Sequence, residues 1–157
     1  MPTSHRFTTI ARISSRWILA LFFIVAGANH FRSPALYLSM MPDWLPWPHA
    51  ANVVSGLGEI LGGIGLLVPA ARSAAGWGLL LLLAAVFPAN LHVALLGHMP
   101  GFSYSPATLW IRLPFQGVLM AWVAWAAIAG GSGRPPQPPR ETAREAGRRL
   151  GSAPGPR

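Results

Sequence analysis

Apolar residues fall into four long runs along the chain, at residues 15–31, 50–71, 74–97 and 109–131. Each run is close to the roughly 20 residues that an α-helix needs to cross the hydrocarbon core of a bilayer, although the first is the shortest. The pattern therefore predicts an all-α integral membrane protein in which residues 15–131 form a four-helix bundle. Residues 1–14 precede the bundle as a short cytoplasmic segment.

The sequence changes character after the fourth run, where residues 132–157 read SGRPPQPPRETAREAGRRLGSAPGPR. Proline lacks an amide hydrogen, and a polar segment of this kind cannot bury enough apolar surface to fold. We expect a disordered basic C-terminal tail that acts as a solvated anchor. Specific contact of the tail with anionic lipids is the alternative.

Composition separates this chain from soluble domains. It is 52% hydrophobic and only 10% charged, with a mean hydropathy of +0.42, whereas soluble domains carry about 25% charged residues. The net charge of +8 comes from arginine, since the chain has no lysine, and it suits anionic lipid headgroups better than nucleic acid. The absence of cysteine excludes disulfides, thiol chemistry and Cys-ligated metal for this chain itself.

Arginine placement predicts the orientation in the membrane. Arg6, Arg12 and Arg16 lie at the start of the first run, Arg72 separates the second run from the third, and six arginines lie in the tail. Because cytoplasmic loops are enriched in arginine, we expect both termini in the cytoplasm and residues 32–49 and 98–108 outside.

The first run also has an alternative interpretation. Basic residues, the segment WILALFFIV and the small residues 26–28 match a secretory signal with a cleavage site. Cleavage would leave three helices. We favour retention, because signal-like first helices are common in membrane proteins and the following segment is typical of a membrane interface.

Glu59 is the single acid inside the apolar runs, in SGLGEILGGIGLL. A carboxylate at this depth costs several kcal/mol unless it finds a partner, a proton or water. On a helix it shares a face with Ser55, Gly58 and Gly62, and small residues allow another helix to approach closely. We therefore expect Glu59 to point into the bundle.

Other strongly polar residues lie, on this topology, in the outer half of the membrane or at its outer edge, whereas the inner half is apolar. Pro88 and Pro114 fall at matching depth in this half, and each frees a backbone carbonyl. The asymmetry predicts an outward-facing polar pocket rather than a pore. The predicted pocket residues are Asn29, His30, Glu59, Asn90, His92, Arg112 and Gln116.

Arg112 is the natural counter-ion for Glu59, since its guanidinium can pair with a carboxylate in bidentate fashion. The sequence leaves open whether Glu59 is ionised against Arg112 or protonated, and whether the pair is a structural tie or part of a functional site. We expect no metal site, because His30, His49, His92 and His98 lack the close spacing of a ligand motif.

Five segments in order resemble the DoxX family of small four-helix membrane proteins of bacteria and archaea. They are AGANHF (26–31), YLSMMPDWLP (37–46), SGLGEILGGIGLL (55–67), VFPANLHVAL (86–95) and IRLPFQ (111–116). The resemblance covers roughly residues 15 to 130, and it implies a place in the cytoplasmic membrane, a link to quinone and thiol or oxidative stress, and membrane-associated redox enzymes as partners. The absence of cysteine puts a direct thiol role in doubt.

Three functions remain open at this stage. The first is a quinone-associated redox subunit in which Arg112, His92 or Asn90 binds a quinone carbonyl and Glu59 relays a proton. The second is a non-catalytic scaffold that docks partner proteins. The third is a small-solute carrier, which we rank last because the inner half offers no polar path and no internal repeat is visible. Whether the chain is an enzyme is left open.

Overall fold

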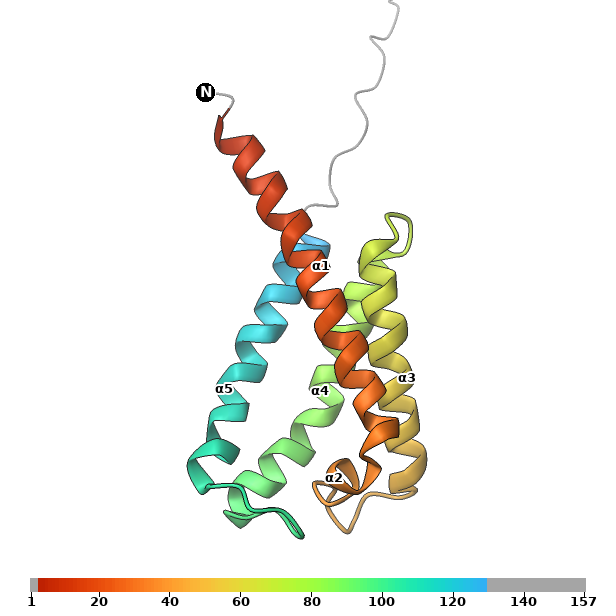
Figure 1. Ribbon diagram of the computed structural model, residues 1–157, viewed down its shortest axis with the longest axis vertical. Coiled ribbons are helices and arrows are strands. Elements are labelled where there is room, and N and C mark those ends of the chain that lie inside the picture. The colour runs from red at the N-terminus through yellow and green to blue at the C-terminus, as the bar shows by residue number, and fades with distance from the viewer. Residues whose placement is uncertain (1–2, 130–157) are drawn as a thin grey trace, which may run out of the picture.

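The computed structural model describes residues 3–129 and is built from α-helices. These are α1 (Thr3–Arg32), α2 (Pro34–Leu38), α3 (Pro48–Leu67), α4 (Arg72–Leu96) and α5 (Pro106–Val123), which continues into a π-helical turn, η1 (Ala124–Ile128). The four long helices pack together as a bundle (Figure 1). The all-α fold is therefore confirmed. The predicted tail, residues 132–157, lies outside the described residues.

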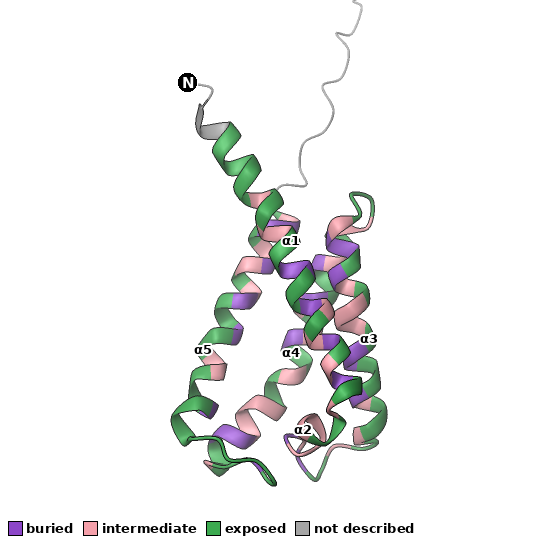
Figure 2. Cartoon of the chain, in the orientation of Figure 1, coloured by how far each residue is buried: buried purple, intermediate pink, exposed green. Residues whose placement is uncertain are grey.

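The four long helices are long and apolar enough to cross a membrane, over Arg6–Arg32, Pro48–Leu67, Arg72–Leu96 and Pro106–Ile128. Much of their outward surface is exposed (Figure 2). Large apolar side chains are part of that surface, since Leu61, Leu81 and Val118 are 66%, 70% and 65% exposed. Contact of such a large apolar surface with water would be unfavourable, whereas lipid tails would cover it. The chain is thus a multi-pass membrane protein with four candidate spans.

Several helix ends differ from those expected from the apolar runs. Helix α1 begins at Thr3, because residues 3–14 hold no proline or glycine to stop it. Helix α3 ends at Leu67, since Pro69 cannot donate a helical hydrogen bond. Helix α5 begins at Pro106, where the side chain of Ser105 accepts from the Thr108 amide.

Glycines set the distance between α1 and α3. A Cβ atom on Gly27 would lie 2.6 Å from the carbonyl oxygen of Gly56, and one on Gly63 would lie 2.8 Å from the carbonyl oxygen of Ala20. Only glycine allows the two backbones to come so close. The expected small-residue stripe has a different neighbour, because Gly62 faces Leu79 of α4.

Apolar side chains fill the bundle unevenly along its length. We call the end that holds the α3–α4 connection the turn end and the opposite end the α2 end (Figure 1). The turn end contains the main core, and the α2 end contains a smaller one. The main core is formed by Leu19, Phe23, Leu66, Leu79, Leu83, Leu119, Val123, Ala126 and Ala127. The smaller core is formed by Met40, Val93, Ala94, Met99 and Leu109. A polar cavity borders both.

Candidate functional site

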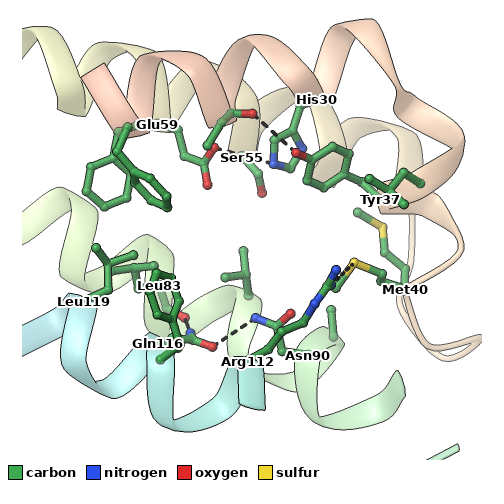
Figure 3. A pocket seen from close by; sticks show the side chains of 18 residues that line it. His30, Tyr37, Met40, Ser55, Glu59, Leu83, Asn90, Arg112, Gln116 and Leu119 are labelled. Atoms are coloured by element: carbon green, nitrogen blue, oxygen red, sulfur yellow. Dashed lines mark hydrogen bonds and ion pairs between the residues drawn. The ribbon is translucent and has the colours of Figure 1, made fainter. Parts of the chain in front are cut away.

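The cavity has a volume of about 290 Å³ and is lined by residues of α1, α2, α3, α4, α5 and the loop after α2. Two polar walls face each other across it (Figure 3). One wall carries His30, Tyr37, Ser55 and Glu59, and the other carries Asn90, Arg112 and Gln116. Side chains of the main core, Phe23, Leu83 and Leu119, also line the cavity, and Leu83 and Leu119 lie beside Gln116 on the second wall (Figure 3). The bundle thus holds a cavity with polar groups on two facing walls and apolar side chains around them.

His30 is held in one orientation by Asn52, which lies near the start of the neighbouring helix α3. Asn52 Nδ2 donates to the backbone oxygen of His30 at 3.1 Å, and Asn52 Oδ1 lies 2.9 Å from His30 Nδ1. Because Oδ1 can only accept, Nδ1 must carry the hydrogen. The second ring nitrogen, Nε2, is consequently a free acceptor when the imidazole is neutral.

Glu59 is the group that faces this free nitrogen. Its Oε2 lies 3.7 Å from His30 Nε2, and its side chain is only 13% exposed. Among the described residues, Glu59 Oε2 has no hydrogen-bond partner. The carboxyl and the imidazole thus face each other at the wall of the cavity without a hydrogen bond between them.

Tyr37 completes this wall. Its ring stacks on His30 with 3.6 Å between ring centroids, its hydroxyl accepts a hydrogen bond from Asn29 Nδ2 at 3.0 Å, and it donates to the Ala26 carbonyl at 3.5 Å. Burial raises the pKa of the Tyr37 phenol, which keeps it neutral and able to donate. Asn29 thus positions Tyr37 instead of lining the cavity.

The opposite wall begins with a chain of amides. Asn90 Nδ2 donates to Gln116 Oε1 at 3.0 Å, and Gln116 Nε2 donates to the backbone oxygen of Leu83. Pro88 and Pro114 stand two residues before these amides, inside α4 and α5. The amide chain links the two helices where the prolines remove backbone donors.

Arg112 is not the partner of Glu59, contrary to the pairing suggested by the sequence. Its Nη1 donates to Met40 Sδ at 3.3 Å, and its Cζ lies 5.4 Å from the centroid of the Tyr104 ring. Within residues 3–129, His30 is the basic group that meets Glu59. Most of the Arg112 guanidinium donors therefore have no partner in the described part of the chain, and Arg112 lines the cavity.

Five of the seven predicted residues therefore line one cavity: His30, Glu59, Asn90, Arg112 and Gln116. His92 does not line it, and Asn29 acts on it through Tyr37. Asn52 was not among the predicted residues, although it lies seven residues before Glu59 on the same helical face. The described part of the chain contains no group of three or more His, Cys, Asp or Glu side chains that could hold a metal.

Fold and cavity together define a multi-pass membrane protein of four packed helices with a polar cavity inside the bundle. Residues 19–127 match the family model of a domain of unknown function, DUF8561, and the chain belongs to this family. Neither a curated protein nor a solved structure matches the chain. These comparisons do not show membership of the DoxX family, and that resemblance stays a prediction.

Proposed function

We propose that this protein binds the headgroup of a quinone in the cavity and serves a membrane redox system as its quinone-associated subunit. The observation that carries the proposal is the pair of facing polar walls in a cavity that apolar side chains also line (Figure 3). A quinone ring is flat and apolar, with one carbonyl acceptor at each end. It requires donors on two opposite sides and apolar contact between them.

The residues present fit this ligand. Arg112 offers donors on one side, and the proton held by His30 and Glu59 offers a donor on the other. When Glu59 is protonated on its buried, unpartnered Oε2, this group can donate a hydrogen bond to a quinone carbonyl. The volume of about 290 Å³ suits a single ring, since it lies at the lower limit of ligand pockets, which span about 300–1,000 Å³.

Quinone reduction consumes two electrons and two protons, and the reverse reaction releases them. In our proposal the His30–Glu59 pair gives or takes one proton at one carbonyl, and water exchanges the second proton at the other carbonyl, which Arg112 holds in place. Electrons pass to or from a partner enzyme, since the chain has no cysteine and its described residues offer no metal cluster. The resemblance to the DoxX family supports a partner of the membrane-bound redox class.

The same proposal includes the orientation. The arginines of the turn end and the tail face the cytoplasm, the α2 end faces outward, and the membrane is the cytoplasmic membrane of a bacterium or an archaeon. The cavity then opens toward the outer leaflet. The tail remains a proposed contact for anionic lipids.

The two other functions have less support. A scaffold would dock partner proteins through the tail or the outer loops and would use Glu59 only to join helices, whereas Glu59 lies at the wall of a cavity with an unpartnered carboxyl oxygen. A carrier requires a polar path through both halves, and the turn end is filled by the apolar main core. The ligand cavity is therefore the better supported function.

Mass spectrometry of small molecules extracted from the purified protein tests the proposal. Wild type, Glu59→Gln, Arg112→Gln and His92→Gln are compared at equal folded amount, with His92→Gln as the matched control because His92 does not line the cavity. We expect quinone in wild type and His92→Gln, and a loss in the other two. No enriched quinone in any sample, with the cavity variants only less stable, would contradict the proposal.

A further inference from the structure

Three arginines gather at the turn end, far along the bundle from the cavity. Arg16 and Arg72 line the same small cavity of about 70 Å³, together with Ile13 and Trp17. Arg12 precedes Arg16 by four residues and so lies on the same face of α1. Arg12 also lies over the Trp125 ring while Arg16 contacts the adjacent Ala126, so the three charges form one cluster.

Two of these arginines cap helices with only part of their donors. Arg16 Nε donates to the Ala126 carbonyl at 2.8 Å, in the last turn of the α5–η1 helix, and Arg72 Nε donates to the Leu66 carbonyl at 3.2 Å, in the last turn of α3. Each guanidinium has five N–H donors. Capping therefore leaves the terminal amino groups of both side chains available.

Helix capping does not neutralise the cluster. The carboxyl end of a helix carries a partial charge of about −0.5, so two helix ends offset about one of the three positive charges. The two acids among residues 3–129 are Asp43 and Glu59, in the loop after α2 and in the polar cavity. An excess of about two positive charges remains at the turn end.

Arg12 carries a buried hydrogen-bond donor that has no acceptor among residues 3–129. Its Cζ lies 5.5 Å from the centroid of the Trp125 ring, and its Nε is buried without a hydrogen-bond partner in the described part of the chain. A buried donor without a partner costs free energy that an anionic acceptor would recover. The cluster thus has excess positive charge, terminal amino groups of Arg16 and Arg72 that are available as donors, and an unpaired donor on Arg12.

We propose that Arg12, Arg16 and Arg72 form a binding site for the phosphate of an anionic phospholipid headgroup. Guanidinium forks match the oxygens of a phosphate, and basic pockets at the cytoplasmic ends of spanning helices bind such headgroups. A lipid is favoured over free phosphate because Ile13 and Trp17, which line the cavity, are also 47% and 62% exposed. Apolar surface therefore continues from the phosphate site onto the lipid-facing side of α1.

The test measures lipid-dependent thermal stability of the full chain in a neutral detergent. Phosphatidylglycerol is titrated into the protein, with phosphatidylcholine and inorganic phosphate as comparison probes at equal ionic strength. Phosphatidylglycerol should raise the Tm, and the two comparison probes should not. Arg12→Gln should weaken the apparent affinity for phosphatidylglycerol about tenfold, the effect of one lost charge-assisted contact.

Arg6→Gln is the matched control, because Arg6 is an exposed arginine on the same helix. It should bind phosphatidylglycerol as wild type does. Equal weakening in Arg6→Gln and Arg12→Gln would overturn the site in favour of diffuse surface attraction, and an equal Tm rise with inorganic phosphate would overturn the lipid assignment. Should Arg12→Gln fail to fold, Arg12→Lys replaces it, and affinity as high as that of wild type would count against a guanidinium site.

Discussion

At the scale of single residues, the central fact is how a carboxyl group is accommodated inside the membrane. Glu59 faces His30 Nε2 at 3.7 Å, and His30 is itself fixed by two hydrogen bonds with Asn52. His30, which the sequence predicted as a pocket residue, thus depends on Asn52, which was not predicted. Asn52 sets the tautomer of His30 and leaves Nε2 of the ring to face Glu59.

Asn52→Leu tests this dependence. The variant removes both hydrogen bonds and leaves His30 Nδ1 and the His30 carbonyl unpaired, so the free energy of unfolding should fall by about 1–3 kcal/mol. Reversible unfolding in detergent measures the change. Asn29→Leu is the comparison, since it removes only the bond to Tyr37 and should cost less than half as much. Equal losses in both variants would show that the Asn52 contacts have no special role.

At the scale of elements, the close packing of α1 on α3 brings the residues of the first wall together. His30 and Asn52 meet because Gly27, Gly56 and Gly63 let the two helices approach at backbone distance. The small-residue pattern in the sequence indicated such packing but not its partner helix. The faces through which α1 and α3 contact each other depend on the rotation of each helix about its axis. The packing of the whole bundle determines this rotation.

Gly56→Ala should disturb both stability and site. Its new Cβ would lie 2.8 Å from His30 Cβ and 3.0 Å from the Gly27 carbonyl oxygen, so the helices must move apart. We expect a loss of about 1–3 kcal/mol, seen as a lower Tm, together with weaker quinone binding.

Gly117→Ala provides the control for that substitution, because nothing lies within 4 Å of its new Cβ. Alanine has a higher helix propensity than glycine, by about 1 kcal/mol, so the control should be neutral or stabilising. A Gly56→Ala protein as stable as Gly117→Ala would argue against close α1–α3 packing.

At the scale of the whole molecule, the cysteine-free sequence offers a direct test of orientation. Ser73, exposed at the start of α4, and Ser103, exposed in the connection between α4 and α5, lie at opposite ends of the bundle. In intact cells, a membrane-impermeant maleimide should label Ser103→Cys and leave Ser73→Cys unlabelled until the cells are opened. The reverse pattern would place the cavity on the cytoplasmic side.

The fold was largely predictable because long apolar runs determine membrane spans without knowledge of any contact. Most of the site was also predictable, since His30, Glu59 and Arg112 are polar groups that lipid would reject. The partner of Glu59 was not, because Arg112 and His30 lie on different helices whose rotation the sequence does not specify. Tyr37 was missed because it sits on α2, a five-residue helix with no periodic signal.

The most direct test of the central claim is a calorimetric titration of the purified protein with a short-tailed benzoquinone. Wild type and His92→Gln should bind one equivalent with equal affinity. Glu59→Gln and Arg112→Gln should each bind about tenfold more weakly or worse, since each removes one charged or proton-bearing group from a facing wall. Equal affinity in all four proteins, or no saturable binding by folded wild type, would contradict the assignment of the cavity as a quinone site.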